Sequence, residues 1–309
     1  MLLKWSMIQF HLMKNNSILF SIIVPAYNRK SHLEMMIPKI EKINYDNWEL
    51  IIVDDGSNDG TEQLFKSIDD DKVIYIKQIN KERGAARNAG FKIAKGDYVT
   101  FLDSDDYLLP NVFIEALDVI DRNPGIPLFH LGFEMRNLDE DLLQEAEILP
   151  AILNNMLIEK NAIACLGVFI KRDVAELNPF EERRDLSGTE DYELWLRLAS
   201  RYPFLHFNKT IAVLVQHESR SMLDADIDKT IKRIITFIDL VLNNPVVLKF
   251  IDQDLNKFIA HRYSYISLHA AEANHKKIAI SYLFKSITKS PILFFRIRLY
   301  IILKKIIFK

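Results

Sequence analysis

Four short apolar runs alternate with helix-forming segments over the first 120 residues, and this alternation constrains the fold more than any other feature of the sequence. The runs are Phe20–Pro25, Trp48–Val53, Val73–Ile76 and Tyr98–Leu102, rich in β-branched and aromatic side chains. Short runs that are apolar throughout are typical of strands buried on both faces. Strands separated by helices form a parallel sheet with right-handed crossovers. The sequence therefore predicts an α/β fold with a mostly parallel sheet flanked by helices.

The last of these runs leads into a cluster of acidic residues. Asp103 and Asp105 are two residues apart, so in an extended backbone their side chains point to the same side of the chain. Two carboxylates placed this way repel each other unless a cation or water lies between them. Mg²⁺ or Mn²⁺ suits such oxygen ligands and often shares them with a substrate's phosphates. The alternative is a solvated turn that leads into a helix beginning near residues 109–111.

A second pair of acids, Asp54 and Asp55, follows the run Trp48–Val53. Because the carboxyl ends of parallel strands meet at one edge of a sheet, both acid pairs are expected there, where open α/β sheets bind ligands. A carboxylate at this edge can accept hydrogen bonds from a base or a ribose hydroxyl; the alternative is again a solvated turn. Asp59 and Glu62 have the spacing of a capping box, so they are expected to cap the following helix.

Two arginines, Arg83 and Arg87, lie one turn apart in a predicted helix that is rich in Gly and Ala. They could bind phosphate, or they could pair with acids of the neighbouring loops. Neither G-x-G-x-x-G nor G-x-x-x-x-G-K-[ST] occurs, so the sequence lacks both common phosphate-binding loops. A metal ion at Asp103 and Asp105 is then the natural means of holding a diphosphate.

The chain beyond residue 124 predicts further elements. They are strands at 127–135 and 163–170, a helix at 151–160, a loop or short helix at the acidic stretch 137–147, and a two-stranded return at 204–215. Ser187 and Glu190 have the spacing of a capping box. Asp191 then falls in the first turn of a helix, whose dipole stabilises the anion, and an ionised carboxylate there could act as a general base. His217 could touch a metal or a diphosphate, or could cap a helix beginning near Leu223.

The composition is that of an ordinary globular protein, with 49% hydrophobic residues and a net charge of −2 over 309 residues. This balance gives no global bias toward nucleic acid, and no nucleic-acid partner is expected. The single cysteine, Cys165, excludes an internal disulfide and fits a reducing compartment, and its apolar neighbours indicate a buried structural thiol. Residues 1–16 are expected to be a loose N-terminal extension, too short and interrupted to span a membrane.

The C-terminal region, residues 223–309, is expected to be helical, with breaks at Asn243–Pro245 and at Ser290–Pro291. No carboxylate side chain follows Glu272, whereas Lys and Arg recur up to Lys309. The last segment combines apolar and basic side chains and is too short and too charged to cross a bilayer comfortably. It could lie in the interface of an anionic membrane, or pack against the body with a solvated basic face.

Five segments resemble the family-2 glycosyltransferases of the GT-A fold. They are Ser21–Asn28, Ile52–Ser57, Gly84–Gly90, Gly96–Asp106 and Glu190–Trp195, in the family's order and spacing. The resemblance covers roughly residues 20–222. It implies a GT-A-type, Rossmann-like sheet and the transfer of a sugar, with inversion, from a nucleoside diphosphate sugar that is expected to carry UDP.

The resemblance also implies roles for individual residues. Asp191 would take the proton of the acceptor hydroxyl, with Glu190 in support. The metal, Mn²⁺ or Mg²⁺, would be held by Asp103, Asp105 and His217, with Asp106 in support. The residues expected to bind the nucleotide sugar are Pro25, Ala26, Tyr27, Asn28, Asp54, Asp55, Arg83, Arg87 and Ser104.

These expectations divide the chain into a GT-A domain at 17–222 and a helical region at 223–309. The domain's nucleotide-binding half is expected to end near residue 124, and its acceptor half to follow. The Gln-x-x-Arg-Trp pattern of processive synthases is absent, which favours addition of one sugar per event. The acceptor is expected to be a saccharide or lipid-linked saccharide in cell-surface polysaccharide synthesis.

The expected location is the cytoplasm, with peripheral contact of the tail to the inner face of the membrane. The alternatives are a sugar-nucleotide nucleotidyltransferase, a catalytically inactive nucleotide-sugar binder, and a receiver-type regulatory domain. A receiver-type domain needs only about 120 residues and would leave the second acid-bearing half, with Asp191, without a role.

Overall fold

The computed structural model describes residues 18–217 and 226–308, which form two compact units. The first unit extends to Ile152 and also contains Ile163–Phe180 and Phe204–His217. The second contains Leu153–Ala162, Glu181–Pro203 and the C-terminal helices. The units cut across the expected boundary at residue 222, because two short segments from the middle of the chain pack with the C-terminal helices. The expected extension at 1–16 lies outside the described residues.

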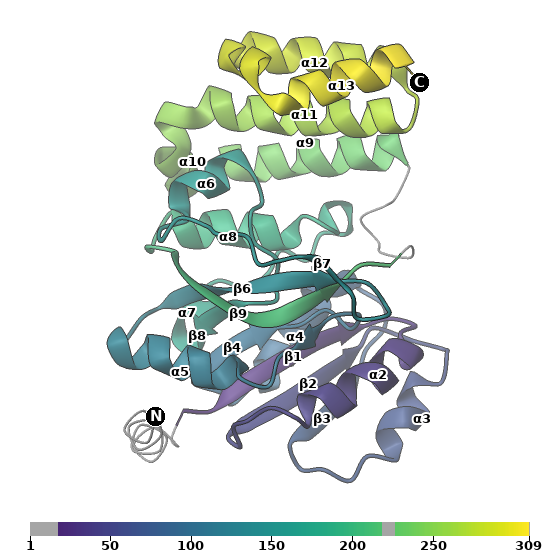
Figure 1. The fold of residues 1–309 in the computed structure, drawn as a ribbon, viewed down its shortest axis with the longest axis vertical. Coiled ribbons are helices and arrows are strands. Elements are labelled where there is room, and N and C mark those ends of the chain that lie inside the picture. The colour runs from purple at the N-terminus through teal and green to yellow at the C-terminus, as the bar shows by residue number, and fades with distance from the viewer. Residues whose placement is uncertain (1–17, 218–225, 309) are drawn as a thin grey trace. The chain divides into compact units, whose positions relative to one another are not determined.

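A nine-stranded sheet among the described residues organises the first unit (Figure 1). Its order is β3-β2-β1-β4-β8-β6-β9-β5, and β7 pairs with β6. The strands are β1 Phe20–Ala26, β2 Trp48–Asp54, β3 Val73–Lys77, β4 Tyr98–Phe101, β5 Tyr107–Leu108, β6 Leu128–Arg136, β7 Leu142–Gln144, β8 Val168–Lys171 and β9 Leu205–Val215. The longest pairings, β1 with β2 and β6 with β9, are parallel. The predicted mostly parallel α/β architecture is therefore confirmed.

The helices of this unit are α2 Lys30–Ile40, α3 Thr61–Lys66, α4 Glu82–Ile93, α5 Val112–Arg122 and α7 Arg172–Glu176. The first three connect the parallel strands, as expected for crossovers. Helix α4 packs very closely on the sheet at Gly90. A Cβ atom there would lie 2.6 Å from Cγ2 of Ile23 and 3.0 Å from Cγ2 of Val53, which is too close for any larger residue. This contact explains the small residues of the α4 sequence.

The strand register brings the expected acids to one edge of the sheet. Ala26, the last residue of β1, lies opposite Asp54, the last residue of β2. On the other side of β1, Ile23 lies opposite Phe101, and Leu102 donates its N–H to the Ile23 carbonyl at 3.0 Å. The loops that carry the two acid pairs therefore leave the sheet at the same edge, as the sequence predicted.

Four local expectations were wrong. Residues 204–215 form one long strand rather than a two-stranded return, because β9 continues past a bulge at Asn208 and Lys209 that shifts its register against β6. The acidic stretch contains the exposed strand β7, which extends the sheet beside β6. Strand β8 begins only at Val168. Helix α8, Glu190–Ala199, has Thr189 as its N-cap, so Ser187 and Glu190 form no capping box.

The other predicted capping box is half correct. Asp59 accepts hydrogen bonds from the Thr61 N–H at 3.1 Å and from the Thr61 hydroxyl at 2.6 Å, and so caps the start of α3. Glu62 instead pairs with Lys66 and Lys77 at 2.6 and 2.9 Å. The N-cap residue is Gly60, with a φ of 90°, and not Asp59. Helix α3 therefore begins one residue later than the capping box predicts.

The second unit is helical apart from its turns. Its helices are α6 Asn154–Glu159, α8 Glu190–Ala199, α9 Ile227–Asn243, α10 Pro245–Ile251, α11 Leu255–Glu272, α12 Lys276–Lys289 and α13 Ile297–Phe308. The breaks predicted at Asn243–Pro245 and at Ser290–Pro291 both occur, and Asn244 caps α10 through its side chain. Among the described residues, no single helix is long and apolar enough to cross a membrane. Helix α9 and residues 245–272 together have the length and composition of a membrane span, but the chain bends by 96° between them.

Candidate active site

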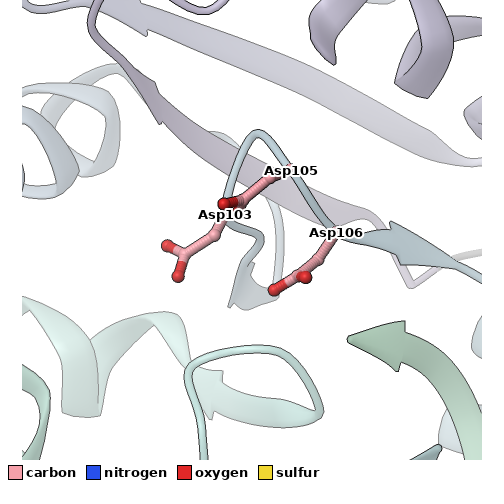
Figure 2. Close-up of side chains that lie close together, drawn as sticks. All are labelled: Asp103, Asp105 and Asp106. Carbon is pink, nitrogen blue, oxygen red and sulfur yellow. The ribbon is translucent and has the colours of Figure 1, made fainter. Parts of the chain in front are cut away.

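Three carboxylates meet in the turn that follows β4. Asp103, Asp105 and Asp106 each offer an oxygen, and these oxygens lie within 4.8 Å of one another (Figure 2). The backbone there is a turn closed by the Asp106 N–H, which donates to the Asp103 carbonyl at 3.0 Å. The expected extended Asp-x-Asp geometry was therefore wrong. A turn gathers these three acids more closely than a strand could, because a strand would direct Asp106 to the opposite face.

The chemistry of this oxygen cluster suits a hard divalent cation. Carboxylate oxygens are the ligands that Mg²⁺ and Mn²⁺ prefer. The side chains of Asp103 and Asp105 are 31% and 12% exposed, so a ligand can reach them, whereas Asp106 is buried. Asp106 accepts the Val215 N–H through Oδ1 at 2.9 Å, which ties the turn to the end of β9. Asp106 thus has a structural task in addition to any contact with a metal.

Arg87 lies against the cluster from α4. Its Nη2 donates to Asp103 Oδ1 at 2.8 Å, and its guanidinium lies 5.2 Å from the ring centre of Phe180. Of the two alternatives open for the arginines, this structure shows Arg87 paired with an acid of the neighbouring loop. Arg83 lies one turn earlier on α4 and is partly exposed.

His217 lies on the other side of the cluster, beyond the end of β9. Its Nε2 is 3.0 Å from Asp105 Oδ2, and its ring centre is 5.5 Å from that of His32 on α2. Burial and then the nearby Arg29 lower the pKa of His32, which favours its neutral imidazole. The structure brings His217 to the acids as predicted. Direct binding of His217 to a metal remains a prediction.

The acids after β2 hold their loop together. Asp54 is fully buried and accepts hydrogen bonds from the Ser57 N–H at 2.7 Å and the Tyr75 hydroxyl at 2.5 Å. Burial and the Asp54 carboxylate raise the pKa of Tyr75, which therefore stays a donor. Asp55 accepts from Gln78 Nε2 at 2.7 Å and from the backbone N–H groups of residues 81 and 82, both at 2.9 Å. The two carboxylates join β2, β3 and the start of α4.

The loop after β1 completes this edge of the sheet. Tyr27 is 51% exposed, so its ring is available to a ligand. Asn28 has a φ of 52°, and its N–H donates to the Ser57 hydroxyl at 2.8 Å. Its side-chain oxygen in turn accepts the Asn58 N–H at 3.0 Å. Pro25 and Ala26 are the last two residues of β1 and precede Tyr27 directly, so all four expected residues lie at one strand end beside the acid-bearing loops.

A pocket of about 280 Å³ opens beside Asp105 and Ser104 within the first unit. Its size is close to the lower limit for small-molecule sites, about 300 Å³. The lining residues are His32, Met35, Met36, Lys39, Ser104, Asp105, Asp106, Tyr107, Asn137, Leu138, Glu140 and Val215. Sequence reasoning missed those on α2 and in the β6–β7 loop. No motif could have found them, because a histidine and two methionines on an amphipathic helix are ordinary core and boundary residues.

Asp191 belongs to the second unit, in the first turn of α8. Its Oδ1 accepts the Tyr192 N–H at 2.6 Å, and its Oδ2 accepts from Asn161 Nδ2 at 3.3 Å. Glu190 is buried and accepts the Gly188 N–H at 2.6 Å. The side chain of Asp191 is partly exposed at a helix N-terminus, a position that stabilises its ionised form.

A buried arginine from α11 holds this helix in place. Arg262 donates to the Tyr192 hydroxyl at 2.5 and 2.6 Å, to the Ile158 carbonyl at 2.8 Å and to the Glu159 carbonyl at 3.0 Å. Its guanidinium also lies 4.4 Å from the ring centre of Phe258. Arg262 therefore joins α11, α8 and α6, and it does so through the residue next to Asp191.

The family of the chain follows from comparison with known proteins. Residues 21–175 match the sequence model described as Glycosyl transferase family 2. The chain belongs to this family. It is a glycosyltransferase, and the expected GT-A-type fold and family are both confirmed. The acid-bearing loops and α4 all lie within the matched range, whereas Asp191 and His217 lie beyond it.

Two relatives of this family-2 glycosyltransferase come from Escherichia coli. One is the UDP-Glc:alpha-D-GlcNAc-diphosphoundecaprenol beta-1,3-glucosyltransferase WfgD, 28% identical over 229 residues, which are 74% of this chain and 88% of WfgD. The other, WfaP, carries the same description and is 31% identical over 187 residues, which are 59% of this chain and 71% of WfaP.

Solved structures share the fold at lower identity. Residues 1–349 of TarS from S. aureus in complex with UDP-GlcNAc match with a TM-score of 0.61 and 16% identity, over 90% of this chain and 93% of that one. The mannosyltransferase PcManGT from Pyrobaculum calidifontis, in complex with GDP-Man and Mn²⁺, matches with a TM-score of 0.57 and 15% identity, over 100% of this chain and 95% of that one. At this identity the likeness shows the fold alone.

Proposed function

We propose that this glycosyltransferase transfers a single sugar from a UDP-sugar to a hydroxyl of a saccharide or lipid-linked saccharide, with inversion at the anomeric carbon. The observation that carries the proposal is the cluster of three carboxylates at the end of β4. A cluster of oxygen ligands at the carboxyl edge of a parallel sheet suits a metal-bound diphosphate. Family membership then selects sugar transfer among the reactions that use such a site.

Asp103 and Asp105 would hold Mn²⁺ or Mg²⁺, with Asp106 and His217 next to them. When bound, the cation would stabilise the negative charge that develops on the leaving nucleoside diphosphate. Arg87 fixes the orientation of Asp103 before substrate arrives, since its guanidinium already donates to Oδ1. The residues therefore form a site whose geometry is prepared rather than assembled on binding.

The donor would lie along the three loops at the same edge of the sheet. The exposed ring of Tyr27, with Pro25, Ala26 and Asn28, would contact the nucleoside. Asp54 would support this site from beneath, because both its oxygens are used inside the protein. Asp55 would contact the nucleoside only if it exchanged part of its hydrogen bonds to residues 78–82. Arg83 and Ser104 would approach the diphosphate from α4 and from the acidic turn.

Asp191 would remove the proton of the acceptor hydroxyl as that oxygen attacks the anomeric carbon. The bond to the diphosphate breaks on the opposite face, so one displacement inverts the configuration. Asn161 donates to the Asp191 carboxylate and would orient it, and the start of α8 favours its ionised form. Glu190 supports this turn through the Gly188 N–H.

The names of WfgD and WfaP support UDP-glucose as the first donor to test and a lipid-linked diphosphate saccharide as the first acceptor. A lipid-linked acceptor would place the enzyme on the inner face of the membrane, and the basic tail at 291–309 would contact that anionic surface. The acceptor end of the site would include the pocket beside Asp105, since part of its lining comes from the acceptor half.

The test is calorimetric titration of the purified protein with UDP-, GDP- and dTDP-sugars, each with and without Mn²⁺. We expect binding of UDP-sugars that depends on the metal, and no metal-dependent binding in the Asp105→Asn variant. Asp118→Asn is a matched control, because Asp118 pairs with Arg122 on α5 and lies outside the cluster. Equal binding with and without metal would overturn the role of the cluster, and a preference for GDP or dTDP would overturn the UDP-sugar assignment.

A further inference from the structure

Helix α13 is apolar on two opposite faces. Leu299 and Ile302 are buried in a small cluster with Leu283 of α12, which fastens α13 to its neighbours. On the outer side, Ile297 and Tyr300 are 79% and 70% exposed. A surface helix of a water-soluble protein normally presents polar side chains outward. The outer face of α13 therefore has the composition of a buried surface, although no part of the described chain covers it.

Exposed apolar side chains also occur on α12 and in the turn between the two helices. Ile280 and Phe284, one turn apart on α12, are 54% and 69% exposed. In the connecting turn Pro291–Phe295, Ile292 and Phe294 are 62% and 58% exposed. Figure 1 shows α12 and α13 side by side over α11, which both helices contact. Large exposed apolar side chains that gather on neighbouring elements mark an interaction site.

Basic residues accompany this surface, and acids are absent from its sequence. From residue 273 to the end, the chain has nine Lys and Arg residues and no Asp or Glu: Lys276, Lys277, Lys285, Lys289, Arg296, Arg298, Lys304, Lys305 and Lys309. Lys277 and Lys304 are exposed and have no carboxylate partner within the described residues. The occupant of the surface must therefore be apolar in part and negatively charged in part.

We infer that the outer face of α12, the Pro291–Phe295 turn and α13 docks on an anionic lipid bilayer, with α13 lying flat at the boundary between headgroups and acyl chains. A second copy of the chain would set this basic sequence against an identical one, and the nearby carboxylates of Glu159 and Glu272 already contact Arg296 and Lys305. A helix of 12 residues is about 18 Å long and cannot cross a hydrocarbon core of about 30 Å. Interfacial binding satisfies both the apolar side chains and the cations.

This inference deepens the proposed function. It rests on that proposal in one respect, because the lipid-linked acceptor is the reason for the enzyme to bind a membrane. Relative to the sequence-based expectation for residues 291–309, it adds α12 to the docking surface. Ile280 and Phe284 distinguish a docking surface that includes α12 from one limited to residues 291–309, because both residues lie on α12.

The test is co-sedimentation of the full chain with phosphatidylcholine vesicles, with and without phosphatidylglycerol. We expect binding to rise about tenfold when the anionic lipid is present. Ile297→Ser and Phe284→Ser should each lower that binding several-fold, and Lys277→Gln together with Lys304→Gln should remove most of the dependence on phosphatidylglycerol. Ile79→Ser is the matched control, because Ile79 is 84% exposed on the first unit and lies outside this surface. It should bind as the parent chain does.

Three results would overturn the inference. They are equal binding to both vesicles, wild-type binding by all of these variants, and a dimer in solution that Ile297→Ser dissociates without changing vesicle binding. Transfer to a water-soluble acceptor reports the proposed function separately. Loss of that activity with intact vesicle binding counts against the enzyme proposal, and intact activity with no vesicle binding counts against the docking surface.

Discussion

Arg87 donates a hydrogen bond to Asp103 across 2.8 Å, and only 1% of the arginine's surface is exposed. A buried cation on α4 thus orients one of the carboxylates that would hold the metal. Groups next to metal ligands commonly set the orientation and charge of those ligands. The pair therefore links the packing of α4 on the sheet, through Gly90, to the geometry of the acidic turn.

Replacing Arg87 with Gln should weaken Mn²⁺ binding by roughly tenfold to a hundredfold, because loss of a group next to a metal ligand has effects of that size. Calorimetric titration with Mn²⁺ measures this directly. Arg83→Gln, one turn away on α4 and partly exposed, should leave metal affinity unchanged. If Arg87→Gln bound Mn²⁺ as tightly as the parent chain, Arg87 would have no positioning role.

Chelation should abolish sugar transfer. We expect EDTA to stop turnover, and Mn²⁺ or Mg²⁺ to restore it, because the described acidic turn suits hard divalent cations. Initial rates before and after metal addition are the measurement. Asp105→Asn should not be rescued, whereas Asp118→Asn should respond as the parent chain does. Full activity of the metal-free protein would remove the metal from the mechanism.

Asp191→Asn should retain donor binding and lose turnover by about a hundredfold to ten-thousandfold, the usual contribution of a positioned general base. The measurements are kcat with a saturating acceptor and donor affinity by calorimetry. Glu193→Gln, in the same turn of α8, should keep most of its kcat, because that carboxylate is already held by Arg197 at 2.7 Å. A near-normal kcat in Asp191→Asn would exclude Asp191 as the base.

Arg262→Met should lower the free energy of unfolding by about 3 kcal/mol. The substitution leaves the carbonyls of Ile158 and Glu159 without their donor, and each unpaired buried group costs about 1–3 kcal/mol. Urea unfolding followed by circular dichroism measures the change. Lys257→Met, which breaks partly exposed pairs with Glu159 and Asp254, should cost under about 1 kcal/mol. Equal midpoints for the two variants would contradict the role assigned to Arg262.

Stability should fall as the pH is lowered from about 6.5 to about 4. Burial, and then Arg262, lower the pKa of His261 to about 4, and burial also lowers the pKa of His130. The unfolded chain takes up these protons near pH 6.5 and the folded chain does not, so acid favours unfolding across this window. Urea midpoints at several pH values test this, and His261→Gln should show a shallower decline. A pH-independent midpoint over that range would refute the prediction.

Local spacing and side-chain type predicted most of the sheet, because buried parallel strands leave an apolar pattern that depends little on context. The same information failed for the Asp103–Asp106 turn, for Ser187 and Glu190, and for the long strand β9. For the acidic turn and for β9, a neighbouring element decided the outcome. Pairing of β9 with β6 overrode the turn-like pair Asn208-Lys209, and the end of β9 holds Asp106 through the Val215 N–H.

The sequence by itself determined the strand–helix alternation, the acids at strand ends, the family, and the helical, acid-free C-terminal region. These properties reside in residue type and spacing along the chain. Only the tertiary structure decided that Arg87 pairs with Asp103 and that Arg262 holds α8 through Tyr192. Arg87 and Asp103 are 16 residues apart in the chain, and Arg262 and Tyr192 are 70 apart. Such contacts form because separate elements pack on a common core, and no local pattern of residues records that packing.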